Sequence, residues 1–107
     1  MLLTTTPTIE GQAVTQYLGI VSSEVIIGAN VIKDAFAGLR DFFGGRSGAY
    51  ERVYQEARTE ALRELEQRAA ALGAQAVIGV HLDFQTVGSG GMMMVGATGT
   101  AVKLRSL

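Results

Sequence analysis

The fold is decided by the stretch Gly44-Gly45-Arg46-Ser47-Gly48-Ala49-Tyr50-Glu51, a glycine-rich turn that leads into a helix. A pair of glycines suits the left-handed conformation that ends a preceding helix. Ser47 or Gly48 is then predicted to begin the next helix. Glu51 falls in its predicted first turn, where the helix dipole favours a carboxylate. The stretch therefore predicts a turn between two helices.

The helix after this turn is predicted to be long and apolar on one side. Apolar residues recur there at three- and four-residue spacing, which is typical of an amphipathic helix: Tyr50, Val53, Tyr54, Ala57, Ala61, Leu65, Ala69 and Leu72. Gly73 suits the position just after the last turn. A helix of about 25 residues is about 40 Å long, so we expect part of it to pack on a neighbour.

The helix before the turn is predicted over residues 30–43. Asn30 is a good N-cap, because its side-chain oxygen accepts a hydrogen bond from a first-turn N–H. The residues that follow it form one apolar face at helical spacing: Ile32, Ala35, Phe36, Leu39, Phe42 and Phe43.

Four segments predict strands. Residues 2–6 form the first, ended by Pro7, and residues 14–27 form one bent strand or two short ones joined at Ser22-Ser23. Residues 75–87 alternate in polarity, and 92–104 follow after the glycine-rich loop 88–91. In a strand, alternate side chains share a face, which groups Ile78, Val80, Leu82 and Phe84 against Gly79, His81, Asp83 and Gln85.

The predicted order of elements is thus β-β-α-α-β-β, without the alternating pattern of a doubly wound sheet. We expect one α+β domain over residues 1–107, in which a small antiparallel sheet packs on one long amphipathic helix.

The composition favours a homo-oligomer. Of the 107 residues, 48% are hydrophobic and 18% are charged, and the mean hydropathy is positive at +0.26. A chain this short buries only roughly 60 to 68% of its unfolded surface. Identical copies would bury the excess apolar surface against one another.

Charge and cysteine content exclude several classes of partner and site. The formal net charge is −1 and no basic block is present, so no strong electrostatic attraction to nucleic acid is expected. The sequence has no cysteine, which excludes disulfides and thiolate metal cages. No signal peptide and no membrane-spanning apolar run are recognisable, so we expect a cytoplasmic location.

Four motifs, spread in unbroken order over essentially the whole chain, resemble the YbjQ-like family: Thr4-Thr5-Thr6-Pro7-Thr8-Ile9-Glu10-Gly11, Tyr17-Leu18-Gly19-Ile20-Val21, Phe43-Gly44-Gly45-Arg46-Ser47-Gly48-Ala49-Tyr50 and Gly88-Ser89-Gly90-Gly91-Met92. The resemblance implies a dodecin-like α+β subunit that assembles as a ring-shaped homopentamer. The usual label of this family is heavy-metal binding, and its biochemical role is not established.

Five residues are candidates for contacts with a ligand. Arg46 and Ser47 precede a predicted helix N-terminus, whose N–H groups attract anions. Tyr50, together with Tyr17 and Tyr54, can line a pocket at a subunit junction. His81 and Asp83 lie two residues apart in a strand and hence on one face, where a carboxylate can orient an imidazole.

The residues predict neither a metal site within one chain nor a cofactor. Soft metal ions prefer thiolates or several imidazoles, and the chain has a single histidine. A metal would need Asp83, Glu24 or symmetry copies of His81 as further ligands. Met92 and Met94 share a strand face and can offer thioethers, although packing is the ordinary role of methionine.

We therefore predict a non-enzymatic homo-oligomer that binds a small ligand or a metal ion at subunit junctions. The alternative is a small hydrolase or isomerase that uses His81 and Asp83, with an anion held at Arg46. A third possibility is an accessory ring that docks a larger protein.

Overall fold

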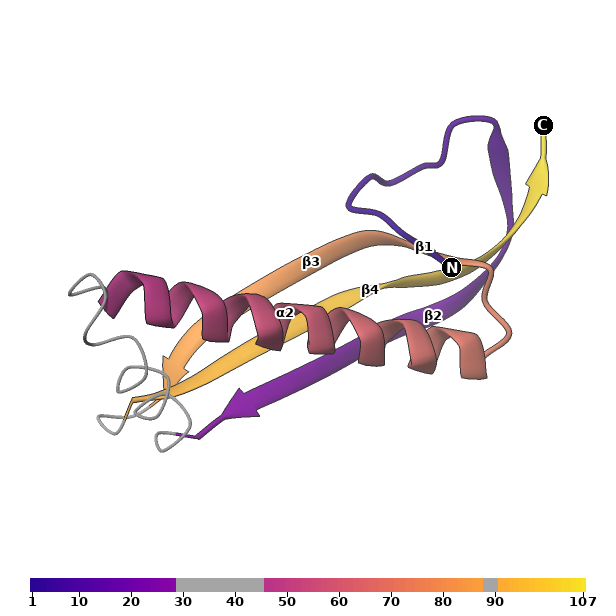
Figure 1. Ribbon diagram of the computed structural model, residues 1–107. Coiled ribbons are helices and arrows are strands. Elements are labelled where there is room, and N and C mark those ends of the chain that lie inside the picture. Colours follow the sequence, from indigo (N-terminus) through magenta and orange to yellow (C-terminus); the bar gives the residue numbers. More distant parts are fainter. Residues whose placement is uncertain (29–45, 88–90) are drawn as a thin grey trace.

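The computed structural model describes residues 1–28, 46–87 and 91–107. Its elements are β1 (Leu2–Leu3), β2 (Gln12–Ile27), α2 (Arg46–Ala71), β3 (Ala76–Val87) and β4 (Met92–Ser106). They form two layers, a four-stranded sheet and the helix α2, which lies along one face of that sheet (Figure 1). This arrangement confirms an α+β fold with one long helix on a small sheet.

The order of the described elements is β-β-α-β-β, which differs from the predicted β-β-α-α-β-β. The predicted helix over residues 30–43, the Gly44-Gly45 turn and most of the loop 88–91 lie outside the described residues.

The strands are arranged as β1-β3-β4-β2. β4 is antiparallel to both β2 and β3, whereas β1 runs parallel to β3. β2 is a single continuous strand, and its irregularities lie at Val14/Gln16 and Tyr17/Gly19 rather than at the predicted joint Ser22-Ser23. Gly19 has a φ of +117° there, a conformation that glycine adopts readily.

The N-terminal segment extends the hydrogen bonding of β1 along β3. The first strand is shorter than the predicted 2–6, but the N–H of Thr4 donates to the carbonyl of Val77, and the carbonyls of Thr4 and Thr6 accept from Val80 and Gly79. The chain then folds over the sheet face opposite α2, where Ile9 packs against a small apolar cluster of Ala76, Ile78 and Val102.

The helix α2 begins at Arg46, one or two residues before the predicted start at Ser47 or Gly48, so Glu51 lies beyond its first turn. Its end is the predicted one. Gly73 has a φ of +84°, and the N–H groups of Gly73 and Ala74 donate to the carbonyls of Ala70 and Ala69. This pair of bonds is a Schellman cap. Leu72 lies past the end of α2 and is 49% exposed, so its predicted place in the apolar stripe is wrong.

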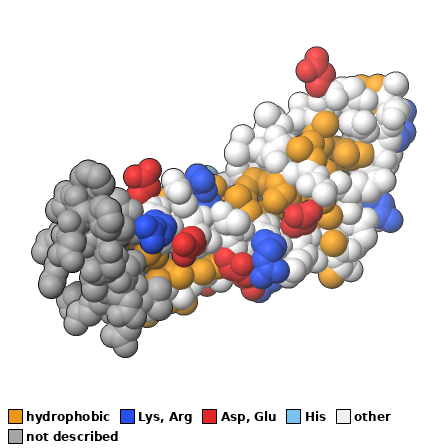
Figure 2. Space-filling view, viewed as in Figure 1, with side chains coloured by type: hydrophobic (Ala, Val, Ile, Leu, Met, Phe, Trp, Pro, Cys, Tyr) orange, Lys and Arg blue, Asp and Glu red, His pale blue; other side chains and the backbone are white. Residues whose placement is uncertain are grey.

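Most of the predicted apolar stripe of α2 forms the core. Five residues spaced by four are buried against the sheet: Val53, Ala57, Ala61, Leu65 and Ala69. The four from Ala57 to Ala69 meet the buried sheet residues Val21, Val77, Val95, Ala97 and Ala101, and Val53 packs with Met93. Figure 2 shows acidic and basic side chains interspersed along the visible side of the molecule. The helix α2 covers one face of the sheet (Figure 1). We call the other face, which is turned away from α2, the open face.

Candidate functional site

A β-bulge in β3 decides which side chains reach the open face. The register of β3 against β4 shifts between Ile78 and His81, so Gly79 and Val80 together stand opposite Gly99. Gly79 has a φ of +61°, which suits a bulge residue without a side chain. One extra residue at this point reverses the alternation of the strand beyond it.

As a result of the bulge, Val80 and Leu82 pack in the core beneath α2. The ring of Phe84 meets that of Tyr54 edge to face, with 5.1 Å between the centroids. His81 and Asp83 therefore lie together on the open face, as predicted. The predicted grouping of Ile78 with Val80 is wrong, because Ile78 precedes the bulge and packs instead with Ile9.

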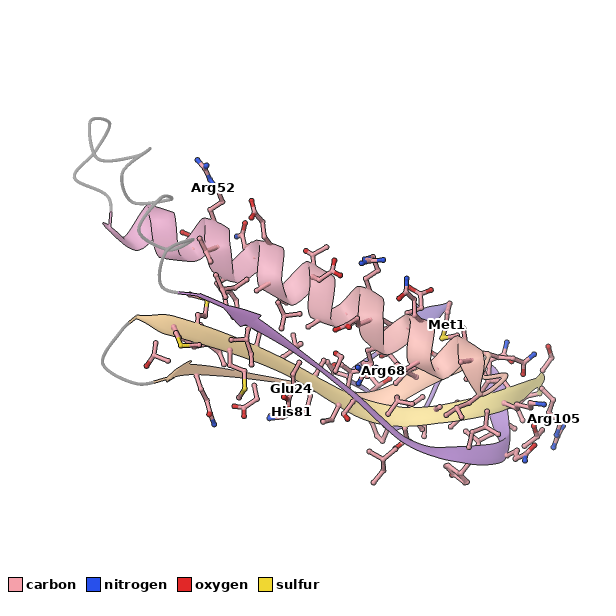
Figure 3. All side chains as sticks on the ribbon, turned by 90° about the horizontal axis from the view of Figure 1, so that it is seen from below. Met1, Glu24, Arg52, Arg68, His81 and Arg105 are labelled. Carbon is pink, nitrogen blue, oxygen red and sulfur yellow. The ribbon has the colours of Figure 1, made fainter. Side chains whose placement is uncertain are left out.

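The open face carries a shallow hollow across three strands. Two cross-strand rows form it: Ser22, Thr98 and His81 in one, and Glu24, Gly96 and Asp83 in the other. Its volume is about 180 Å³, and its lining consists of Ser22, Ser23, Glu24, His81, Asp83, Met94, Gly96, Ala97 and Thr98. In Figure 3, Glu24 and His81 both lie on the side of the sheet away from α2.

The hollow is acidic and has a glycine at its floor. Glu24 and Asp83 bring two carboxylates, and no lysine or arginine is among the residues that line it. A Cβ atom built on Gly96 would meet only the carbonyl oxygen of Ser23, at 3.7 Å. The space above Gly96 is thus open, and a side chain in its place would partly fill the hollow.

His81 and Asp83 do not form a hydrogen-bonded dyad. The Asp83 carboxylate accepts a long hydrogen bond of 3.5 Å from the amide of Gln85, and no bond to His81 is present among the described contacts. No serine or threonine hydroxyl is bonded to His81 among them either. The geometry therefore gives no specific support to the hydrolase or isomerase alternative.

The other three candidate residues lie in α2, on the opposite side of the sheet from the hollow. The backbone of Arg46, Ser47 and Tyr50 forms the first turns of α2, and their side chains are outside what the structure describes. The sheet separates this layer from the hollow. Tyr17 pairs with Val102 and Phe84 with Val95, so Tyr17 and Tyr54 lie far apart along β4.

In the part of the chain that the structure describes, a four-stranded sheet, one covering helix and an acidic hollow on the open face define a small α+β protein with a candidate ligand site. Residues 1–105 match the family model described as "Putative heavy-metal-binding", so the chain belongs to the YbjQ-like family.

A solved structure of similar fold is a protein of unknown function in the DUF74 family, from Pediococcus pentosaceus. It is 17% identical, with a TM-score of 0.62 over 98% of each chain. At this identity the likeness supports the fold alone. Within the described ranges, no helix is long and apolar enough to cross a membrane.

The side chains of the hollow do not fit a soft heavy-metal ion. Such ions select thiolates and thioethers or several imidazoles, whereas the hollow offers two carboxylates, one imidazole and the thioether of Met94. Across residues 1–28, 46–87 and 91–107, no three His, Asp or Glu side chains gather closely enough to hold one metal ion. The family label therefore has no matching ligand set in this part of a single chain.

The sequence alone predicted that His81 and Asp83 share one face of a strand, but it did not predict the other residues of the hollow. Glu24 was expected only as an additional ligand, while Ser22, Thr98 and Gly96 were not singled out. Their partnership with His81 and Asp83 depends on the strand order and register. One pattern in the sequence could have indicated them. Alternate residues of a strand share a face, which places Ser22 and Glu24 on the same face as Ile20 and Ile26.

Proposed function

We propose that this chain is the non-enzymatic subunit of a cytoplasmic homo-oligomer, which holds a small ligand or cation on the open face, at junctions between copies. The observation that carries the proposal is the apolar surface beside the hollow. Ile20 and Ile26 flank Ser22 and Glu24 on β2 and are 83% and 57% exposed. Large apolar side chains gathered around a polar hollow are typical of a surface that meets a partner.

The edge of the sheet also supports a second copy as that partner. β2 is the last strand of the sheet, and among the described residues no strand pairs with its outer edge. Natural edge strands are usually protected by lysine, proline or bulges. The two bulges of β2 lie before Ile20, and the strand has no lysine, arginine or proline. In the half of β2 beside the hollow, the guanidinium of Arg68 on α2 donates a hydrogen bond to the carbonyl of Ser22. A strand that paired there would have to displace this contact.

The geometry of the hollow supports a ligand at the junction. It is shallow in one chain, and a neighbouring copy seated on Ile20 and Ile26 would cover it. The number of five copies in a ring, and the dodecin-like classification of the subunit, rest on the family resemblance. The absence of cysteine from the sequence is compatible with a cytoplasmic location.

Light scattering on purified protein tests this proposal. Wild type should have the mass of an oligomer at micromolar concentration. Ile26→Lys places a charge on the open face and should shift the mass towards that of one chain, because a charge buried in an apolar contact is strongly unfavourable.

Leu72→Lys is the matched control, since Leu72 is also an exposed apolar residue but lies beyond the end of α2. It should leave the oligomer intact. If the wild-type protein scatters as a monomer, the proposal is wrong. If both variants dissociate equally, the assignment of the contact surface is wrong.

A further inference from the structure

The outer edge of β2 carries backbone groups that no strand of the described residues bonds. β2 ends the sheet and pairs with β4 on its inner side. In a strand, neighbouring residues direct their carbonyls to opposite edges. The carbonyl oxygen of Ser23 faces β4, because it is the nearest atom, at 3.7 Å, to a Cβ placed on Gly96. The carbonyl of Ser22 therefore points outward, away from β4.

The side chain of Arg68 bonds to this outward carbonyl. Its Nη1 donates a hydrogen bond of 2.5 Å to the oxygen of Ser22, which connects α2 to the edge of β2. Its Nη2 lies 4.0 Å from the carboxylate of Glu64, one helical turn earlier. A guanidinium has five donors and no acceptor, so it can hold both oxygens at once. The contact places a bulky cation where an added strand would have to bond.

The part of β2 beside this contact has little protection of its own against an added strand. Natural edge strands are usually protected by lysine, proline or bulges. From Val21 to Ile27, β2 pairs with β4 without irregularity, and it has no basic residue and no proline there. Four of these seven residues are valine or isoleucine, which favour strands. The cation on this edge is supplied by Arg68 from the neighbouring helix.

We infer that Arg68 blocks strand addition at the outer edge of β2. While its guanidinium bonds to Ser22, a second copy cannot pair with this half of the strand, and contact through the open face is left as the route to assembly. The strand that is kept away is β2 of another copy, because two identical edges can pair about a two-fold axis. The inference goes beyond the proposed function, since the contact acts on the edge whether or not the open face joins copies.

Light scattering on Arg68→Ala, at the concentration used for wild type, tests the inference. The average mass should rise about two-fold or more, because pairing about a two-fold axis joins assemblies in pairs. Alanine is the strongest helix former, so α2 should be retained, and circular dichroism verifies the fold.

Arg63→Ala is the matched control. Arg63 lies on the same helix and its side chain is 57% exposed, against 56% for Arg68, but its guanidinium bonds to Glu60 and not to the sheet. The variant loses the same charge and should keep the mass of wild type.

Two further measurements separate strand pairing from unspecific aggregation. In Arg68→Ala, the outward N–H groups of Ser22 and Glu24 should exchange with solvent more slowly than in wild type, because a paired strand bonds them. Glu24→Pro removes one of these donors, and proline is tolerated on an edge strand where the N–H faces outward. Added to Arg68→Ala, it should restore the wild-type mass.

Three results would overturn the inference: an unchanged mass in Arg68→Ala, an equal rise in Arg63→Ala, or a rise without slower exchange at the outward N–H groups. The proposed function is decided separately, by the mass of wild type and of Ile26→Lys. A monomeric wild type would contradict that proposal, and the comparison of Arg68→Ala with Arg63→Ala would still decide the role of Arg68.

Discussion

The hydroxyl of Ser23 donates a hydrogen bond of 2.6 Å to the main-chain carbonyl of Ala61, which joins the second half of β2 to the middle of α2. Both residues are buried, Ser23 with only 2% exposure. Alanine at positions 57, 61 and 69 lets the helix backbone come this close to the sheet. This contact joins the two layers within an apolar core, and beside it the guanidinium of Arg68 on α2 donates to the carbonyl of Ser22.

Replacement of Ser23 by alanine should lower the free energy of unfolding by about 1 kcal/mol, the net value of one buried hydrogen bond. The loss stays moderate because the carbonyl of Ala61 keeps its place in the helix. Urea unfolding at fixed protein concentration measures it. Ser22→Ala, on the exposed neighbour, is the control and should change stability little; equal losses in both variants would contradict this role of Ser23.

Enlarging Ala61 should be more damaging than removing the hydroxyl. Ala61→Leu inserts a branched side chain where the helix touches the sheet, and overpacking of this kind costs about 1 to 3 kcal/mol. Thr59→Leu introduces the same side chain at an exposed position of α2. If the thermal unfolding midpoints of the two variants agree, the close approach of helix and sheet is not needed for stability.

The bulge in β3 requires a glycine at position 99 of β4. A Cβ atom on Gly99 would lie 2.5 Å from the Cγ1 of Val77 and 3.3 Å from the carbonyl oxygen of Ile78. Gly99→Ala should therefore destabilise the protein by about 1 to 3 kcal/mol, whereas Gly96→Ala, three residues earlier, meets no clash. Chemical denaturation of the pair tests the assignment, and equal stabilities would contradict it.

The ion pair between Glu60 and Arg63 on α2 predicts a measurable titration. The hydrogen bond from Arg63 holds the pKa of the Glu60 carboxyl below its ordinary value of 4.5. The pair therefore stabilises the fold above that value, and the contribution is lost as the pH falls through the lowered pKa. Both side chains are well exposed, so the effect on stability is small.

Arg63→Gln should raise the pKa of Glu60 towards its ordinary value, as followed by carbon NMR of the carboxyl group. Arg58→Gln is the control, because the Arg58 guanidinium lies over the ring of Tyr54, 5.8 Å from its centroid. An unchanged Glu60 titration in the Arg63 variant would show that the hydrogen bond does not set the pKa.

The periodic spacing of apolar residues along the chain predicted the long helix and its buried side. The four-residue spacing of Val53, Ala57, Ala61, Leu65 and Ala69 marks the buried side of α2, and Gly73 marks its end. Leu72 was misplaced because this cap ends the helix at Ala71, before the apolar pattern itself runs out.

The site was harder to predict because it depends on contacts between distant segments. The bulge at Gly79 is stabilised by Thr4 and Thr6, and a strand of strict alternation would have kept Ile78 beside Val80. The meeting of Glu24 with Asp83 across Gly96 follows from the position of β4 between β2 and β3. Strand order of this kind is not encoded in the period of any single segment.

We propose that identical chains contact one another through the open face of the sheet. Native mass spectrometry of the purified protein at low micromolar concentration tests it most directly. We expect a closed assembly of several 11.3 kDa chains, five by the family resemblance, which dissociates in the Ile26→Lys variant. A single 11.3 kDa chain as the dominant wild-type species would contradict it.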